Sequence, residues 1–448
     1  MVFIKRKIEN ILLQWKENSN SLPLMLIGAR QTGKTFIINK FCESNYERKI
    51  EINFMQNEIF KSFFENSLNP TDIIENIEIY FHTDVNPNNT VIFLDEIQEC
   101  EKAILALKFF AESKIQYNII SAGSLLGVKL NRLKTAFPVG KVQIEYMFPL
   151  DFEEFLWAMD EKMLNNKIYQ SFVDNKPFAN VIHEKALALC RNYLFLGGMP
   201  AVICNYLDCN KEITKISTKI KEDIITGYMA DMAKYSENIN SIKIIKVYNS
   251  IKDQLAQEQK KFRYKLVEEK GNSQKFETAI EWLIQAGLVL FCPLISNPVR
   301  PLKPDKNDKS FKLYLSDVGL LVHLAGIKLF DIQSNRDFNY IGALTENYAA
   351  QTITSINEKL YYWASGNEAE IDFLLSQETG IIPCEVKAAD NVKSKSLSVY
   401  VSKYKPEYSI RISAKNFGFE NGIKSTPLYA THCLNSVMRM TTKNVNYI

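Results

Sequence analysis

The chain has few of the residues that build histidine-rich metal sites or disulfide-bonded folds. Its 448 residues include four histidines and eight cysteines. Only Cys204 and Cys209 lie close together, and no histidine stands near them at the spacing of a zinc site. We therefore expect reduced thiols, as is usual for a cytoplasmic protein, and no histidine-based metal centre.

The chain also lacks a long hydrophobic run. No stretch approaches the ~20 consecutive apolar residues that a membrane-spanning helix needs. Residues 1–15, MVFIKRKIENILLQW, mix basic and apolar residues and lack the continuous apolar core and the cleavage site of a signal peptide. We expect no membrane partner and a cytoplasmic location.

An excess of charge of one sign is absent as well. Lys and Arg number 54 and Asp and Glu number 51, which gives a formal net charge of +3. This near-neutral balance does not indicate nucleic acid as a partner, and it does not exclude a local basic face. The hydrophobic fraction of 46% is ordinary for a globular protein, and the length predicts two to four domains.

What the chain does contain is GARQTGKT at residues 28–35, which matches the phosphate-binding pattern G-x-x-x-x-G-K-[ST]. An apolar run precedes it and a helix-forming run follows it. The two glycines let the backbone curl so that N–H groups face phosphate oxygens, and the helix N-terminus adds its dipole. Lys34 would reach the β- and γ-phosphates of ATP, and the Thr35 hydroxyl would ligate Mg²⁺. The alternative is a simple glycine turn, which this context disfavours. The expected nucleotide-binding residues are Gly28, Ala29, Arg30, Gln31, Thr32, Gly33, Lys34, Thr35 and Phe36.

A second motif follows the short apolar strand predicted at 91–94. The strand ends in Asp95 and Glu96, two carboxylates in the order and position of a Walker B motif. Asp95 would hold Mg²⁺, and Glu96 would orient and polarise the attacking water, so Glu96 and Lys34 are the expected catalytic residues. Alone, such a pair would be read as a solvated strand end. Because both motifs occur in the expected order and on the expected elements, they predict nucleotide binding.

The surrounding pattern predicts an α/β core. Strands alternate with helices, which favours a parallel sheet covered on both faces. The segment after the strand at 117–122 places Ser124 where such ATPases have a polar residue that senses the γ-phosphate, and a Gly-Ser turn explains it equally well. Strands are expected at 22–27, 49–54, 91–94, 117–122 and 141–148, and helices at 5–17, 35–42, 70–81 and 101–113.

The middle of the chain has two successive patterns of apolar residues. Helical periodicity dominates residues 152–235, and residues 242–315 then read as helices followed by a two-stranded unit, the order of a winged helix. Its basic flank is either a phosphate-facing surface that binds DNA or part of a domain used only for packing. The flank comprises Lys260, Lys261, Arg263, Lys265, Lys270 and Lys275.

The C-terminal part carries a further set of polar residues in an α-β-β-β-α-β order. Glu346 lies on a helix expected at 342–357, Asp372 on a strand expected at 370–375, and Glu385 and Lys387 on a strand expected at 381–388. Glu385 and Lys387 are two residues apart and so share one face. Neighbouring acidic residues, Glu368 and Glu370, are expected to be surface charges.

This order resembles the PD-(D/E)xK, restriction-endonuclease-like fold. The resemblance implies that Glu346, Asp372 and Glu385 hold Mg²⁺ and that Lys387 positions the attacking water. One departure is that no proline precedes Asp372, where the sequence reads AEID. The alternative is a degenerate nuclease fold that binds DNA or protein, because a fold does not imply a function.

Taken together, the P-loop, VIFLDEIQEC, SAGSLLG, FPLDFEEFLWA and LFLGGMPAVICNYL resemble the prokaryotic AAA-superfamily ATPases that carry an uncharacterised C-terminal region. Lys141 follows Gly140 where that family would have an arginine, so no arginine finger is assigned. The resemblance implies a P-loop ATPase core at 1–150, a helical lid at 151–240, a winged-helix-like domain at 241–335 and a nuclease-like α/β domain at 336–448.

The sequence therefore predicts a protein that binds ATP and hydrolyses it with Mg²⁺, and that couples its nucleotide state to a C-terminal module. Two alternatives stay open: an ATP-gated DNA nuclease, and a nucleotide-dependent switch without turnover. The expected partners are ATP and then DNA, a protein or a second copy of the chain.

Overall fold

A computed structural model of the chain describes residues 3–18, 21–124, 140–234, 238–304, 309–333, 340–356, 358–366, 368–377, 380–388 and 395–435. The chain divides into two compact units. The N-terminal unit comprises Lys5–Phe148 with Gln285–Leu288, and the C-terminal unit comprises the rest. The four domains expected from the sequence stay a prediction.

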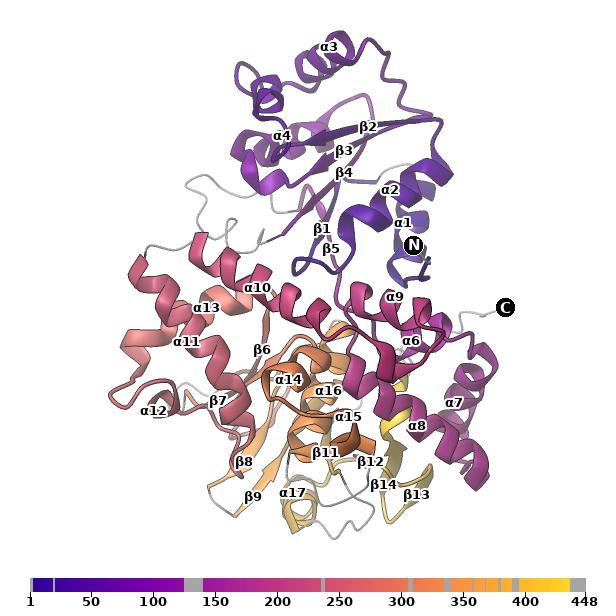
Figure 1. Ribbon diagram of the computed structural model, residues 1–448, viewed down its shortest axis with the longest axis vertical. Coiled ribbons are helices and arrows are strands. Elements are labelled where there is room, and N and C mark those ends of the chain that lie inside the picture. The colour runs from indigo at the N-terminus through magenta and orange to yellow at the C-terminus, as the bar shows by residue number, and fades with distance from the viewer. Residues whose placement is uncertain are drawn as a thin grey trace. The chain divides into compact units, whose positions relative to one another are not determined.

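A five-stranded parallel sheet forms the centre of the N-terminal unit (Figure 1). Its spatial order is β2-β3-β4-β1-β5, and every neighbouring pair runs parallel. All five strands were expected, although the last one is shorter than predicted. The strands are β1 (Leu24–Ile27), β2 (Arg48–Asn53), β3 (Thr90–Asp95), β4 (Asn118–Gly123) and β5 (Gln143–Tyr146).

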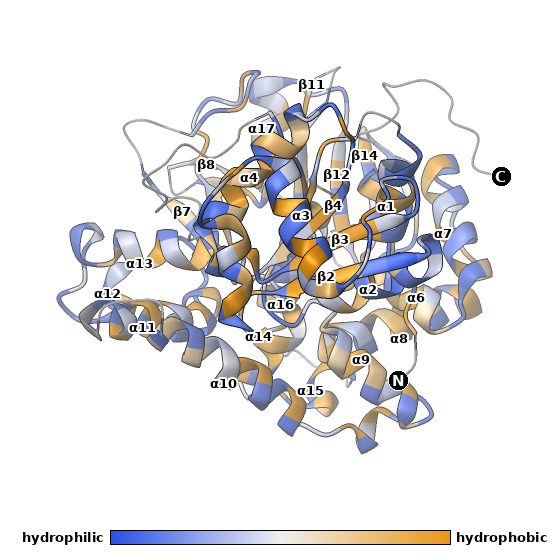
Figure 2. Ribbon diagram, turned by 90° about the horizontal axis from the view of Figure 1, so that it is seen from above, coloured by the Kyte–Doolittle hydropathy of each residue, from blue (hydrophilic) through white to orange (hydrophobic). Residues whose placement is uncertain are grey.

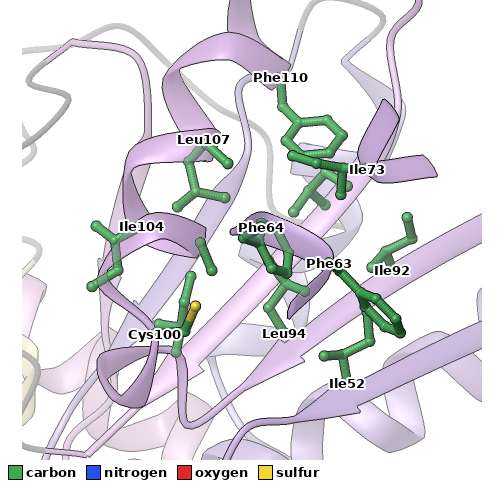
Figure 3. Packing of buried hydrophobic residues seen from close by; sticks show 14 of the residues in the cluster. Ile52, Phe63, Phe64, Ile73, Ile92, Leu94, Cys100, Ile104, Leu107 and Phe110 are labelled. Carbon is green, nitrogen blue, oxygen red and sulfur yellow. The ribbon is translucent and has the colours of Figure 1, made fainter. Parts of the chain in front are cut away.

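Helices cover both faces of this sheet because its buried strands are apolar on both sides. Along β3, Val91 and Phe93 pack in one cluster with α1 and α2, while Ile92 and Leu94 pack in another with α3 and α4. Figure 3 shows the second cluster, with Ile104, Leu107 and Phe110 of α4 close to these strand residues. This confirms the predicted α/β class and the parallel sheet of a P-loop core. The helices are α1 (Ile8–Glu17), α2 (Lys34–Asn45), α3 (Pro70–Phe81) and α4 (Glu101–Glu112), with 3-10 turns at Glu58–Phe64 and Ile97–Glu99.

The first half of the C-terminal unit is mainly helical, as the periodicity predicted. Helix α8 packs against residues near the end of the chain, where His183 lies 2.9 Å from the Tyr429 hydroxyl. A two-stranded antiparallel sheet, β6 (Val289–Pro293) with β7 (Phe311–Leu315), follows the helices. The helices are α6 (Phe152–Ala158), α7 (Lys162–Asp174), α8 (Asn180–Leu196), α9 (Pro200–Asp208), α10 (Lys219–Lys234), α11 (Asn238–Leu255), α12 (Tyr264–Val267), α13 (Ser273–Gln285), α14 (Val318–Leu324) and α15 (Leu329–Gln333), with a 3-10 turn at Ile213–Lys215.

A second five-stranded sheet follows, of mixed direction, in the order β10-β11-β12-β14-β13. Strands β11, β12 and β14 run parallel, and the two edge strands run antiparallel. Strands β8 and β9 form a separate pair. The elements are α16 (Ile341–Ser355), β8 (Trp363–Ser365), β9 (Ala369–Ile371), β10 (Phe373–Gln377), β11 (Gly380–Val386), α17 (Lys395–Tyr404), β12 (Ser409–Ser413), β13 (Gly418–Glu420), β14 (Ile423–Pro427) and a 3-10 turn at Leu428–Cys433.

Two expectations about this part were wrong in detail. The strand predicted at 370–375 is broken at Asp372, because β9 pairs with β8 whereas β10 pairs with β11, and the chain passes from one sheet to the other there. Lys387 lies one residue beyond the end of β11, although its N–H still donates to the Ile412 carbonyl at 2.8 Å. Asp372 is thus a bend residue and not a strand residue.

Polar and apolar residues alternate along helices such as α10 and α11 (Figure 2). In the part of the chain that the structure describes, no helix combines the length and the apolar character needed to cross a membrane.

Candidate functional site

The loop at 28–33 requires glycine at two places. Gly28 follows β1, and a Cβ atom there would lie 2.2 Å from the backbone oxygen of Met147. Gly33 precedes α2 with φ of 94°, in the left-handed region that glycine adopts without strain. The loop therefore has the tight curvature that the motif predicted, and it leads directly into the N-terminus of a twelve-residue helix.

Lys34 is the buried cation of this loop. Its Nζ donates to the carbonyls of Gly28 at 2.9 Å and Ala29 at 2.8 Å, and the residue is only 6% exposed. Burial lowers the pKa of Lys34 to about 8, against the opposing effect of Glu96 and Asp95. A positive group is thus held inside a loop of backbone amides, where an anionic phosphate would be recognised.

Thr35 and Asp95 meet although 60 residues separate them. The Thr35 hydroxyl lies 3.2 Å from both carboxylate oxygens of Asp95, and Asn53 Nδ2 donates to Asp95 Oδ2 at 3.0 Å. Burial, followed by the neighbouring Glu96 charge, raises the pKa of Asp95 to about 6. A hydroxyl and a carboxylate are the hard oxygen ligands that Mg²⁺ prefers, so these residues fit that ion.

Glu96 begins the turn after β3 with a left-handed φ of 50°. The side-chain amide of Gln98 donates to Glu96 Oε2 at 2.5 Å. The negative charge of the Glu96 carboxylate acts to raise the pKa of both Lys34 and Asp95.

Ser124 is buried directly after β4, the strand that lies between β1 and β3. It therefore lies at the same edge of the sheet as the P-loop and Asp95, where the parallel strands end. The sensor and turn interpretations of Ser124 both remain.

The other predicted nucleotide-binding residues have distinct environments. Thr32 is fully buried, and its hydroxyl donates to the Ala29 carbonyl at 2.9 Å. Arg30, Gln31 and Phe36 are exposed. Gln31 has a φ of 66°, which fits a tight loop. In the same unit, Lys141 pairs with Glu112 at 3.1 Å, so it is engaged in a local ion pair.

Sequence reasoning missed Arg6 altogether. The Arg6 guanidinium is buried and donates to the carbonyl of Thr32 at 3.1 Å and to that of Phe148 at 2.7 Å. It therefore joins the P-loop to the residue that ends this unit before the chain continues at Pro149. No short sequence motif predicts the role of Arg6, because its partners are backbone carbonyls 26 and 142 positions away.

Residues 20–156 match the AAA domain family. The match supports an AAA-type P-loop ATPase for this part of the chain. Two domains of unknown function match elsewhere, DUF8612 at residues 187–331 and DUF4143 at residues 341–431. A comparison with curated proteins found no match to the chain.

Solved structures that match the chain include the Walker-type ATPase PABY2304 of Pyrococcus abyssi, at 16% identity and a TM-score of 0.41, with 72% of this chain and 96% of that one covered. The Aeropyrum pernix ORC1 protein in complex with DNA is 11% identical with a TM-score of 0.31, covering 72% and 93%. Drosophila ORC bound to DNA is 12% identical with a TM-score of 0.27, covering 71% and 94%. Likeness at this level does not extend to function or partners.

The second predicted site lies in the C-terminal unit, where lysines lie beside Glu346 and Asp372. Glu346 lies on α16, and both its oxygens accept hydrogen bonds from lysines, Oε1 from Lys312 at 2.9 Å and Oε2 from Lys260. Asp372 Oδ2 accepts from the Val386 N–H at 2.8 Å, and its Oδ1 lies 3.7 Å from Lys312. Within the described ranges, no three His, Cys, Asp or Glu side chains are grouped so as to hold a metal ion.

Glu385 and Lys387 do come together, as their spacing predicted. Lys387 Nζ lies 3.2 Å from Glu385 Oε1, and Arg411 Nε lies 3.4 Å from the other oxygen. Glu370, which was expected to be a surface charge, instead lies 2.6 Å from Lys312 Nζ. Lys312 was not predicted from the sequence, because it lies on β7, outside the C-terminal segment that resembles a nuclease fold.

Two lysines of the basic flank form ion pairs within the C-terminal unit. Lys260 pairs with Glu346, and Lys275 pairs with Glu268. The charges left to face a phosphate are therefore fewer than the sequence suggested. The choice between a DNA-binding surface and a packing role stays open.

Proposed function

We propose that this chain binds ATP together with Mg²⁺ and hydrolyses it. The match at residues 20–156 and the parallel sheet support an AAA-type P-loop domain. One observation above all supports ATP hydrolysis with Mg²⁺: the Thr35 hydroxyl and the Asp95 carboxylate meet within 3.2 Å beside the buried Lys34. Two motifs far apart in sequence thus form one oxygen-rich, cationic site.

Each residue has a separate task in the proposed reaction. The N–H groups of the loop and the Lys34 ammonium would hold the phosphates, and Thr35 and Asp95 would hold the metal. When bound, Mg²⁺ neutralises negative charge on the phosphate oxygens. Glu96 would accept a hydrogen bond from the attacking water and orient it toward the γ-phosphate. The protein would therefore act by positioning and charge stabilisation, as phosphoryl transfer requires.

Phosphate release from ATP and Mg²⁺ tests the proposal. Wild type should turn over, and Glu96→Gln should lose about a hundredfold or more of the rate while still binding ATP, because a positioned base typically contributes ~10²–10⁴-fold. Lys34→Ala should lose ATP binding. The exposed residues Glu101 and Lys108 offer matched controls, since Glu101→Gln and Lys108→Ala make the same chemical changes on α4. Unchanged turnover in Lys34→Ala would contradict the proposal.

The same experiment separates the alternative of a switch without turnover. Tight ATP binding with no phosphate release, in wild type and Glu96→Gln alike, would favour that alternative or an assembly that lacks a partner. Repeating the assay with DNA tests the proposed coupling to nucleic acid. A rate that rises with DNA and falls again with added salt would support a phosphate-facing surface.

A further inference from the structure

The ε-ammonium group of Lys312 lies among three carboxylates of the C-terminal unit. Its Nζ is 2.6 Å from Glu370 Oε1, 2.9 Å from Glu346 Oε1 and 3.7 Å from Asp372 Oδ1. The Lys312 side chain is 0% exposed, and its Nζ lies over the Tyr362 ring, 5.0 Å from the ring centroid. Two of these three carboxylates, Glu346 and Asp372, are residues that the sequence predicted as metal ligands.

The elements around Lys312 make this position a built feature of the fold. Lys312 and Tyr314 are two residues apart on β7 and so share one face, and the Tyr314 hydroxyl donates to Glu346 Oε1 at 2.5 Å. Lys260 donates to the other oxygen of Glu346. Burial alone would raise the pKa of Glu346, but Lys260 and Lys312 outweigh it and hold that pKa below its usual range. The Glu346 carboxylate is thus ionised and engaged at both oxygens.

We propose that Lys312 is the resident cation of this carboxylate cluster, and that the cluster is a structural ion-pair centre rather than a divalent-metal site. A divalent cation needs about six oxygen ligands around one point. Here that point is occupied by an ammonium group, whose N–H donors already use the carboxylate oxygens, and a second cation beside it would be repelled. The remaining predicted ligand, Glu385, faces Lys387 and Arg411.

The proposal explains what the cluster does in the fold. It ties β7 to α16, to β9 and to the bend between β9 and β10 through the ion pairs of Lys312 with Glu346, Glu370 and Asp372. Buried charges of this kind are costly unless every one is paired, and removing one partner is strongly destabilising. The nuclease-like residues would then serve packing and orientation within the unit, and this inference is independent of the ATPase proposal.

A titration of the full chain with Mn²⁺ tests the proposal. Binding is detected as a loss of the electron paramagnetic resonance signal of the free ion. All variants carry Asp95→Asn, which removes the carboxylate charge of the P-loop site, and no nucleotide is added. The parent with Lys312 should leave the Mn²⁺ signal unchanged. Lys312→Ala, which removes the ammonium group shared by the three carboxylates, should bind Mn²⁺ and gain thermal stability with it, and Lys303→Ala serves as a control at an exposed lysine.

Two outcomes would overturn the proposal. The first is Mn²⁺ binding by the parent that disappears in Asp372→Asn or Glu370→Gln, which would show a metal site despite Lys312. The second is a folded Lys312→Ala that still does not bind Mn²⁺, which would show that Lys312 is not what excludes the ion. If Lys312→Ala does not fold, the comparison of the parent with Asp372→Asn and Glu370→Gln still decides the matter.

Discussion

Arg6 holds the backbone carbonyl of Thr32 at 3.1 Å with one arm of its guanidinium, and it reaches the Phe148 carbonyl at 2.7 Å with the other. A planar fork can satisfy two carbonyls at once, whereas a lysine ammonium has a different reach and geometry. The P-loop is thus fixed from the N-terminal segment that precedes α1. This bond gives a first prediction about nucleotide binding.

Replacing Arg6 by Lys is expected to raise KM for ATP roughly ten- to a hundredfold, since a hydrogen bond to a charged group contributes roughly 1.5–3 kcal/mol. The value of kcat should change little, because the loop amides bind the phosphates in the ground state and the transition state alike. Steady-state phosphate release checks this. Arg48→Lys is the control, since Arg48 also donates to a carbonyl, that of Asp84 at 2.9 Å, at an exposed position. An unchanged KM in Arg6→Lys would show that the loop holds its shape without this residue.

The Thr35 hydroxyl should matter for the metal and much less for the nucleotide alone. Thr35→Val keeps the shape but removes the oxygen that lies 3.2 Å from Asp95. We expect about a tenfold weaker affinity for ATP with Mg²⁺, or roughly 1.4 kcal/mol, and little change for ATP in EDTA. Thr35→Ser keeps the hydroxyl and should bind as wild type does. Calorimetric titrations with and without the metal measure the difference, and equal losses under both conditions would remove Thr35 from the metal site.

Gly28 is the glycine whose replacement is expected to damage the loop most directly. A Cβ atom there would lie 2.2 Å from the Met147 backbone oxygen, so either the loop or the segment directly after β5 must move. Overpacking of this kind costs typically about 1–3 kcal/mol. Gly28→Ala should therefore lower the melting temperature and weaken ATP binding. Gly418→Ala, whose added atom meets nothing within 4 Å, should change neither.

Lys221 predicts a pH dependence in the C-terminal unit. Burial lowers the pKa of Lys221 to about 8, against Asp317, from the 10.5 expected when unfolded. Between these two pH values the unfolded chain therefore binds more protons than the folded chain. The free energy of unfolding consequently increases as the pH rises from 8 to 10.5. Relative to Lys221→Met, wild type should gain roughly 3 kcal/mol between pH 8 and pH 10.5.

Urea unfolding of both proteins at the two pH values isolates this effect, because the other titrating groups are common to both. Lys219→Met, at an exposed lysine on the same helix, controls for the loss of a positive charge from α10. A difference between wild type and Lys221→Met that stays constant with pH would mean that the Lys221 ammonium is better solvated than its burial implies.

The sequence by itself determined the strands, helices and predicted site residues of the N-terminal unit, because the information there is local. Residues 28–35 carry the glycines, lysine and threonine of the loop in one stretch, and Asp95 and Glu96 end a strand whose four apolar residues can only be buried. The parallel sheet then brings the two motifs to one edge, since the carboxyl ends of its strands meet there. Strand and helix types followed from periodicity for the same reason.

Only the tertiary structure decided the contacts that join distant segments. Arg6 reaches Thr32 and Phe148, and Lys312 reaches carboxylates 34 to 60 residues further along the chain. The break at Asp372 depends on which strands its neighbours pair with, and that choice is made across the sheet and not along the sequence. Lys312 is a charged residue in an otherwise apolar strand, and the sequence alone gives no reason for it. The tertiary structure places its ammonium group within 4 Å of Glu346, Glu370 and Asp372, and a buried charge is tolerated where an opposite charge is paired with it.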